Sequence, residues 1–286
     1  MKSITILIIG VFLLLSSFAF AQEGESEEPQ YGWQKEAIAS INMTQSSFDN
    51  YAQGGENSTS WQARLGLKFI NDQEKFNWAN TGKFEYGQSK SGDQESKKSV
   101  DEIKLESVLI YKISELLNPY ASITGETQFA PGYNYGEEPK AEISNFLDPG
   151  YFREAIGVSY KPNDIIMARL GAAMKQTVAN DYALVYSDDP ETTTKTEKLK
   201  NEVGAESVVE FNYKISENSL IKSKVELFSN LKAFDEIDVI WDTDLTAKIT
   251  KFIAFNFNVK LVYDKDVSAM RQLKQVMGIG LSYSLF

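Results

Sequence analysis

The sequence predicts an all-β fold, a single antiparallel up-and-down transmembrane β-barrel of about twelve strands. From Ala37 to Phe286 the chain breaks into twelve runs in which apolar and polar residues alternate. Lipid on one face of each strand and a polar lumen on the other produce this pattern. The runs span roughly 10–13 residues, longer than the ~5–6 residues common in globular strands. The connections between runs also alternate, long and polar first, then short.

Each of the first six runs is predicted to be a strand because it has an apolar face opposite a face with polar residues such as Ser, Asn, Lys, Arg or Glu. These faces are Ala37, Ala39, Ile41 and Met43; Trp61, Ala63, Leu65, Leu67 and Phe69; Phe76, Trp78, Phe84 and Tyr86; Ile103, Leu105, Leu109 and Tyr111; Ile123 and Phe129 in the weaker run 120–130; and Phe152, Ile156, Val158 and Tyr160.

The last six runs repeat the pattern, with acidic and basic residues on the inward side. Their apolar faces are Ile166, Leu170 and Met174; Val203, Val209, Phe211 and Tyr213; Ile221, Val225 and Leu227; Ile237, Val239, Trp241, Leu245 and Ile249; Ile253, Phe255, Phe257, Val259, Leu261 and Tyr263; and Met277, Ile279, Leu281, Tyr283 and Leu285 in the run 275–286.

The order of the connections predicts an orientation. The longer ones fall at 46–57, 89–100, 131–150, 177–201, 230–236 and 264–274, and the shorter ones at 71–75, 114–119, 161–164, 214–218 and 250–251. Outer-membrane barrels have short periplasmic turns and longer external loops. We therefore expect both termini in the periplasm.

A soluble β-sandwich also alternates apolar and polar residues. Aromatic residues near the run ends favour the barrel, because transmembrane barrels carry aromatic girdles at both membrane interfaces. These residues are Trp61, Phe69, Phe76, Trp78, Tyr111, Tyr120, Tyr160, Tyr213, Tyr263 and Tyr283. The terminal Phe286 resembles the usual aromatic ending of such barrels but is out of phase with Tyr283 and Leu285.

The first 21 residues have the pattern of a secretory signal. Lys2 precedes an apolar stretch over residues 4–15, and Ala19-Phe20-Ala21 fits a cleavage site before Gln22. The apolar stretch is shorter than the ~20 residues needed to span a membrane. We expect residues 1–21 to be removed, 22–36 to form a periplasmic lead-in, and 37–286 to form the barrel in the outer membrane of a Gram-negative bacterium.

The composition excludes several classes of function. The 29 basic and 40 acidic residues give a net charge of −11, or −12 once Lys2 is removed, which argues against nucleic acid as a partner. The absence of Cys and His removes disulfides, a Ser-His-Asp triad and Cys- or His-ligated zinc. We predict no enzyme activity, cofactor or metal site. Acidic groups at Asp188-Asp189 with Glu191, and at Asp264 with Asp266, lack the spacing of a calcium loop.

The inward faces predict a charge-paired lumen. Lys222 and Lys224 are expected between acidic faces on the preceding and following runs, formed by Glu202, Glu206, Glu210, Asp238, Asp242 and Asp244. Opposite charges on adjacent strands stabilise a sheet by roughly 0.2–1 kcal/mol per pair. Two interpretations stay open: charges that simply satisfy one another, or a selectivity ladder for a permeating solute.

The connection 131–150 is a candidate constriction. Phe146, Leu147 and Asp148 lie between the turn signals Pro131-Gly132 and Pro149-Gly150. Their apolar character would allow the loop to fold into the lumen. Packing of Phe146 and Leu147 on the barrel rim, or against a neighbouring protein, is the alternative.

Some loop segments have more distinctive sequences than a solvated loop needs. They include Asn50-Tyr51-Ala52-Gln53-Gly54-Gly55-Glu56-Asn57, Thr127-Gln128-Phe129-Ala130-Pro131-Gly132-Tyr133 and, less specifically, 143–151 and 261–267. With Trp33 and Phe76-Asn77-Trp78, they make the chain resemble an outer-membrane β-barrel family of Bacteroidota that is catalogued as a domain of unknown function. The resemblance covers most of the mature chain. It implies a location and a fold, and it supplies no activity.

Two functions therefore stay open. The first is a narrow channel for small polar solutes, because twelve strands lie between filled barrels of ~8 strands and open porins of ~16. The second is a non-conducting barrel that binds a partner or supports the envelope. The predicted partners are outer-membrane lipid and, for the second function, another envelope protein.

Overall fold

A computed structural model of the chain describes residues 31–50, 52–188, 195–233, 236–265, 267–268 and 270–285. The predicted signal peptide and Phe286 lie outside these residues. Among the described residues no helix is long and apolar enough to cross a membrane.

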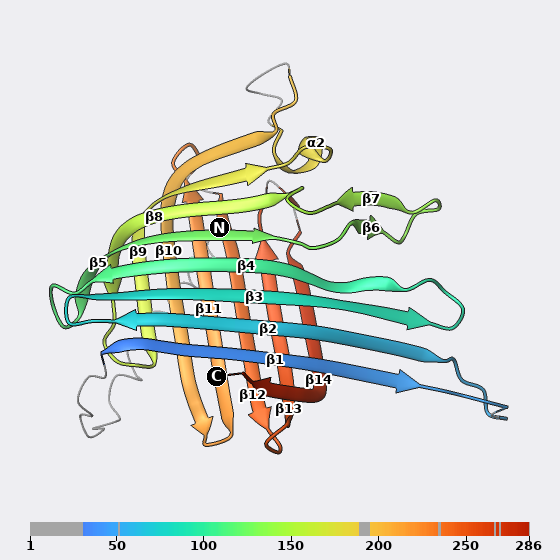
Figure 1. The fold of residues 1–286 in the computed structure, drawn as a ribbon. Helices are drawn as coiled ribbons and strands as arrows, with labels where there is room; N and C mark the ends of the chain where they lie inside the picture. The colour runs from blue at the N-terminus through green and yellow to red at the C-terminus, as the bar shows by residue number, and fades with distance from the viewer. Residues whose placement is uncertain are drawn as a thin grey trace, which may run out of the picture. The chain divides into compact units, whose positions relative to one another are not determined.

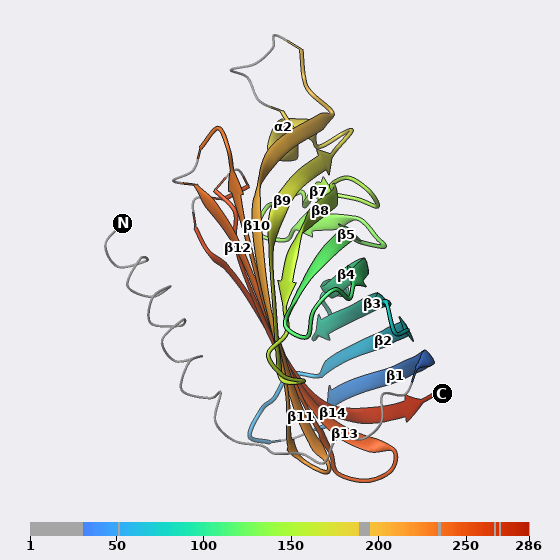
Figure 2. The ribbon, with the colours of Figure 1, turned by 90° about the vertical axis from the view of Figure 1, so that its left-hand side faces the viewer.

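Twelve strands form one closed antiparallel barrel in chain order, and the last strand pairs with the first (Figures 1 and 2). The barrel strands are β1 (Gly32–Ser46), β2 (Ser58–Asp72), β3 (Phe76–Ser91), β4 (Lys97–Tyr111), β5 (Leu117–Thr127), β8 (Gly150–Tyr160), β9 (Ile166–Val178), β10 (Leu199–Ser216), β11 (Ser219–Asn230), β12 (Ile237–Lys248), β13 (Ile253–Tyr263) and β14 (Gln272–Ser284). The predicted fold class is confirmed.

Two small elements lie in the long connections. A hairpin of β6 (Gly132–Asn134) and β7 (Ala141–Ser144) stands between β5 and β8, and the helix α2 (Ala183–Tyr186) follows β9. The end of the barrel that carries these elements is called the long-loop end below. The opposite end, with the turns at 73–75, 112–116, 161–165, 217–218 and 249–252, is called the short-turn end.

Several strand limits differ from the sequence prediction. β1 begins at Gly32, so residues 32–36 of the predicted lead-in belong to the barrel. β3 and β4 stay paired as far as Ser89 and Lys97, so the connection predicted at 89–100 shrinks to 92–96. β5 ends at Thr127 rather than at residue 130. Beyond it, the backbone N–H groups of Phe129 and Ala130 donate to the Asp101 carboxylate, at 2.7 and 3.0 Å, instead of to a neighbouring strand.

The exposure of neighbouring residues confirms the alternation. On β9, Leu170 is 64% exposed whereas Arg169 is 2% exposed. On β8, Ile156 is 67% exposed whereas Ala155 is 3% exposed. Apolar side chains therefore cover the outside of the barrel, and the charged faces of the same strands point inward.

Exposed aromatic residues gather at the short-turn end, as a girdle requires. They are Trp33, Trp78, Tyr111, Tyr160, Tyr213, Phe252 and Tyr283. The indole N–H of Trp78 donates to the Ser107 hydroxyl at 2.9 Å. An unpaired N–H facing hydrocarbon would cost several kcal/mol, so the bond fits a surface covered by lipid.

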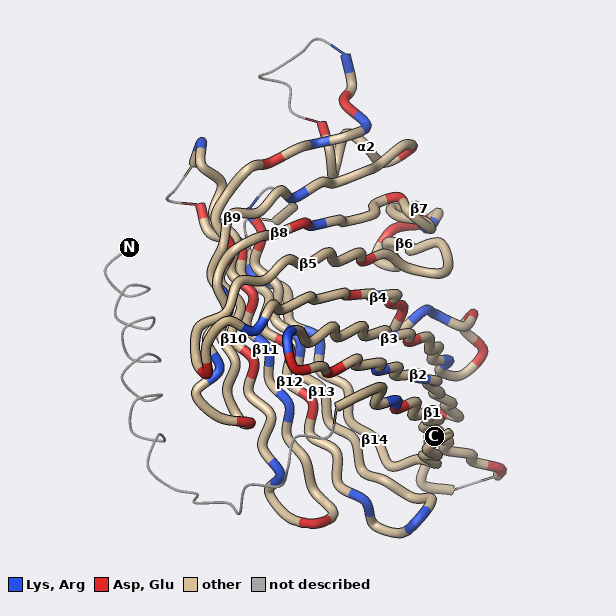
Figure 3. Tube along the Cα trace, turned by 60° about the vertical axis from the view of Figure 1, so that its left-hand side comes forward, with Lys and Arg blue, Asp and Glu red and all other residues tan. Residues whose placement is uncertain are grey.

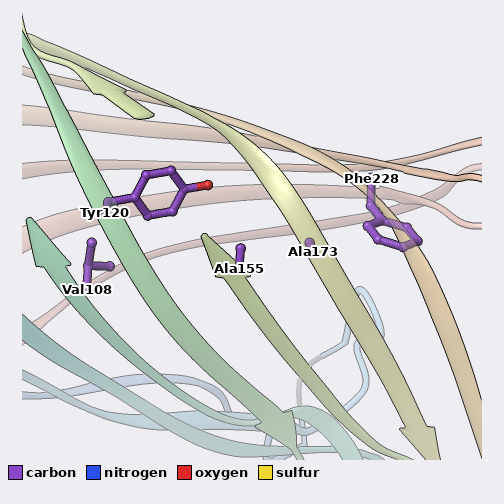
Figure 4. Packing of buried hydrophobic residues seen from close by; sticks show 5 residues of the cluster. All are labelled: Val108, Tyr120, Ala155, Ala173 and Phe228. Carbon is purple, nitrogen blue, oxygen red and sulfur yellow. The ribbon is translucent and has the colours of Figure 1, made fainter. Parts of the chain in front are cut away.

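Tyr120 was predicted to belong to a girdle, and that prediction is wrong. Its side chain is buried inside the barrel, where the hydroxyl donates to Glu206 at 3.2 Å and the ring lies 5.6 Å from the Arg169 guanidinium. Tyr120 belongs to an apolar cluster inside the lumen, which the sequence did not predict. The cluster joins strands β4, β5, β8, β9 and β11 through Val108, Tyr120, Ala155, Ala173 and Phe228 (Figure 4).

Facing walls of the barrel cross one another. β1–β4 run across the direction of β11–β14 in Figure 1, which follows from the tilt that closing a sheet into a barrel demands. Residues on the inward face of one wall are therefore brought near several strands of the opposite wall. This crossing determines the ion pairs of the lumen.

Candidate functional site

Acidic and basic residues recur along the barrel strands (Figure 3), and many of their side chains form ion pairs inside the barrel. Several are as inaccessible as core residues: Glu85, Glu102, Arg169, Glu202, Glu206, Glu226 and Lys260 are all buried. Burying a charge is tolerated when ion pairs and hydrogen bonds satisfy it. The geometry of those pairs therefore defines the site.

One group of pairs joins β2 and β3 to β12 across the lumen. Arg64 makes a two-pronged contact with Asp244, with both nitrogen–oxygen distances at 2.8 Å. Lys83 reaches Asp242 at 3.1 Å. Asn258 donates to both aspartates, at 2.6 and 3.1 Å. These contacts hold the two walls together directly.

A second group joins β4 and β5 to β13 and β14. The Lys260 ammonium lies 3.0 Å from Glu102 and 2.6 Å from Glu126. Lys274 approaches Glu102 at 3.2 Å from the next strand. A cavity of about 360 Å³ at the long-loop end is lined by these four residues together with Tyr151 and others.

A third group joins β4 to β9 and β11. Glu106 accepts from Arg169 at 2.7 Å and from Lys224 at 2.6 Å. Glu226 accepts from Lys104 at 2.8 Å and also contacts Arg153. Each carboxylate therefore serves two or more bases that come from different strands.

The eight residues of the predicted ladder all line the lumen, and the register places Lys224 between Glu210 and Asp242. The close ion pairs, however, mostly leave the neighbouring strand. Lys224 pairs with Glu106 and Glu226, and Lys222 has no ion pair among the described residues. The other members pair as follows: Glu202 and Asp238 with Lys175, Glu206 with Arg153, Glu210 with Arg169, Asp242 with Lys83, and Asp244 with Arg64.

Toward the short-turn end, four inward lysines have no ion pair among the described residues. They are Lys68, Lys214, Lys222 and Lys248, and all four lie toward the short-turn end. Lys68 and Lys222 are near enough to repel one another, while Glu36 and Glu210 offset part of this charge. Basic side chains without a counterion are thus available at the short-turn mouth.

The predicted constriction residues belong to a tight turn after β7. Phe146 and Leu147 are 55% and 40% exposed. Asp148 is buried, and its carboxylate accepts hydrogen bonds from the backbone N–H groups of Asn180 and Asp181, both at 2.8 Å. Asp148 therefore ties this loop to the β9–β10 connection. That the loop constricts the lumen stays a prediction.

Another contact links the long-loop segments. Lys140, just before β7, lies 2.5 Å from Glu95 in the β3–β4 connection. The hydrogen bond and the charge of Lys140 lower the pKa of Glu95. Both side chains are exposed, so the pair adds little stability.

In the described part of the chain, no three carboxylates come together in an arrangement that could hold a metal ion. The weak calcium candidates include Asp189, Glu191 and Asp266, which lie outside the described residues.

The comparisons with known proteins concern the fold. Residues 43–133, about a third of the chain, match a protein family of unknown function (DUF3078). The match includes two of the loop segments on which the resemblance was based. An origin in Bacteroidota stays a prediction. No curated protein matches the chain.

Solved structures similar to the chain include outer-membrane barrels. The translocator domain of autotransporter NalP from Neisseria meningitidis has a TM-score of 0.40 and 9% identity, over 99% of this chain and 96% of that one. An outer membrane channel from Pseudomonas putida F1 has a TM-score of 0.40 and 12% identity, over 92% and 98%. The NanC porin has a TM-score of 0.41 and 7% identity, over 86% and 98%.

Proposed function

We propose that the protein is an integral outer-membrane β-barrel that forms a narrow channel for small polar solutes, closed at rest by the ion pairs across its lumen. The observation that carries the proposal is the lumen itself. It is charged along most of its length, and its facing walls are held together by exchangeable ion pairs. A barrel that served only as a scaffold could fill the same space with packed apolar side chains, often at a gain in stability.

Two nitrogens of Arg169 support access of water to the lumen. Its Nε and Nη1 atoms are buried and donate to no described protein acceptor. An unsatisfied charged donor costs several kcal/mol in a dry interior. Hydrogen bonds to water are therefore expected beside the Glu106 and Glu210 pairs, which provides a polar path between the charged groups.

The unpaired lysines at the short-turn mouth favour one sign of charge in the permeating solute. Their charge would raise the local concentration of small anions at that end. We therefore expect the open channel to favour anions over cations, although the chain as a whole is acidic.

Planar-bilayer recordings test the channel. We expect small, infrequent openings for the wild-type protein. The double variant Lys104→Ala with Lys224→Ala removes two basic side chains that reach across the lumen, and it should increase conductance several-fold. Lys90→Ala is the matched control, because Lys90 is exposed on β3 and makes no ion pair among the described residues. If neither the wild type nor the double variant conducts, the channel proposal is refuted.

A second candidate function rests on exposed apolar residues at the long-loop end. Leu184 and Val185 on α2 are 75% and 56% exposed. Just before α2, the backbone N–H groups of Asn180 and Asp181 bond to Asp148, which follows Phe146 and Leu147 in the chain. A protein partner on this rim would explain such exposure. A wild-type complex of fixed stoichiometry that Leu184→Glu abolishes, together with a lumen that never conducts, would favour this function over the channel.

A further inference from the structure

A pocket on the outer face of the barrel joins polar and aromatic side chains at the short-turn end. Its volume is about 390 Å³, and it is lined by Trp33, Lys35, Phe69, Trp78 and Asn80. The residues come from β1, β2 and β3. The register places Lys35 beside Phe69 and Phe69 beside Asn80, so these three side chains form one row on the same face.

Two groups of this row are hydrogen-bond donors without a protein partner. Within the described chain, the exposed Lys35 ammonium makes no ion pair or hydrogen bond. The Asn80 amide nitrogen donates to no described acceptor. A lysine and a carboxamide with free N–H groups, side by side on a surface otherwise apolar, need an acceptor from outside the protein.

The orientation of Asn80 is determined by its neighbours. The Ser107 hydroxyl accepts the Trp78 indole N–H at 2.9 Å, so its single proton is available for Asn80 Oδ1, which lies 2.8 Å away. The amide oxygen of Asn80 therefore faces Ser107, and its amide nitrogen points to the other side. This chain of hydrogen bonds fixes the donor before any ligand arrives.

The surroundings match the two ends of a lipid. The ring centroids of Trp33 and Trp78 lie 6.1 Å apart beside the row, and tryptophan is enriched at the interface between headgroups and hydrocarbon. The next row toward the centre of the barrel wall contains Leu67, Gly82 and Leu105, with no charged side chain. A headgroup at Lys35 would thus place its acyl chains along an apolar surface.

We propose that this pocket binds the phosphate of one membrane phospholipid, with Lys35 and Asn80 as donors and the two indoles as walls. The proposal rests on the membrane insertion of the proposed function and is independent of conduction. Positive charge without a protein counterion selects an anionic group, and the position in the girdle selects a lipid as its source. The lipid would join β1, β2 and β3 from outside, close to the seam between β1 and β14.

Binding is measured by native mass spectrometry of the barrel refolded in detergent. The probes are phosphatidylglycerol and diacylglycerol with the same acyl chains, and inorganic phosphate is the competitor. We expect one retained phosphatidylglycerol, no retained diacylglycerol, and no displacement by phosphate at equal concentration. Retention of diacylglycerol, or displacement by phosphate alone, would overturn the assignment of a phospholipid.

Two variants test the residues. Lys35→Gln removes the charge, and Asn80→Asp keeps the acceptor for Ser107 while replacing the amide donors by a carboxylate. Each should weaken retention about tenfold, as expected for the loss of a charge-assisted hydrogen bond. The control Lys251→Gln changes an exposed lysine beside the aromatic residue Phe252 at the same end. Equal retention in all variants, or equal loss in the control, would overturn the proposal.

Folding and insertion are followed separately. Heat-dependent gel mobility reports the folded barrel, and flotation with liposomes reports membrane insertion. A barrel that folds but does not float refutes the proposed membrane location. A barrel that floats but shows no selective retention refutes the lipid site alone.

Discussion

Glu106→Gln removes one charge from the middle of the lumen and leaves two bases, Arg169 and Lys224, without their closest carboxylate. Removing one partner of a buried ion pair generally costs about 3–5 kcal/mol. Both bases keep a second acid, since Arg169 lies 3.1 Å from Glu210 and Lys224 lies 3.3 Å from Glu226. The loss should therefore fall near the lower limit, about 3 kcal/mol of unfolding free energy.

The measurement is equilibrium unfolding in guanidinium chloride of the barrel refolded in detergent, followed by tryptophan fluorescence. Glu36→Gln is the matched control, because Glu36 also faces the lumen but makes no ion pair among the described residues; it should change stability by less than about 0.5 kcal/mol. Combining Glu106→Gln with Lys224→Gln should recover at least about 1 kcal/mol of the sum of the single losses. Equal losses for Glu106→Gln and Glu36→Gln, or strict additivity in the cycle, would refute the interpretation of the lumen as a set of coupled ion pairs.

Three further predictions concern single parts of the barrel. Gly171→Ala should cost about 3 kcal/mol or more and reduce the refolded yield, because the added Cβ would lie 2.3 Å from a carbonyl oxygen of the neighbouring strand; a wild-type yield on heat-dependent gel mobility would contradict this. Asp148→Ala should leave barrel stability unchanged and accelerate proteolysis of the β9–β10 connection, because two backbone N–H groups lose their acceptor; unchanged cleavage would count against the tether. Lys68→Gln with Lys222→Gln should lower the anion preference in reversal-potential measurements under a KCl gradient, whereas Lys90→Gln should not, and an unchanged ratio would exclude the short-turn lysines as the source of selectivity.

The faces of the strands could be predicted from the sequence because a period of two fixes them. Parity alone places Arg153 and Arg169 on the inward faces of their strands, and in the structure Arg169 is buried while Arg153 pairs with Glu206 inside the barrel. The partners of these residues were not predictable. A contact such as Arg64 with Asp244 depends on strand tilt and on the register of the whole ring, neither of which is encoded in one strand.

The inward position of Tyr120 could have been predicted from the glycines on the two strands that follow it. Tyr120 pairs with Gly157, and Gly157 pairs with Gly171, so two inward positions beside the ring carry no side chain. A Cβ on Gly171 would lie 2.7 Å from the Tyr120 hydroxyl. Adjacent inward glycines therefore indicate a bulky neighbour in the lumen, whereas a position near a run end indicates only a membrane interface.

In the proposed channel, the connected ion pairs of the lumen lower the cost of opening. They form an unbroken chain in which each inner member has at least two partners: Arg169, Glu106, Lys224, Glu226, Lys104, Glu126, Lys260, Glu102, Lys83 and Asp242. When one contact between the walls lengthens, each ion keeps a second counterion, and the full cost of an isolated buried charge does not arise. If the pairs were separate, breaking each of them would leave two buried charges without any counterion. In the proposed channel, a shared network can exchange partners as a solute passes, so the ion pairs that cross the lumen are compatible with conduction.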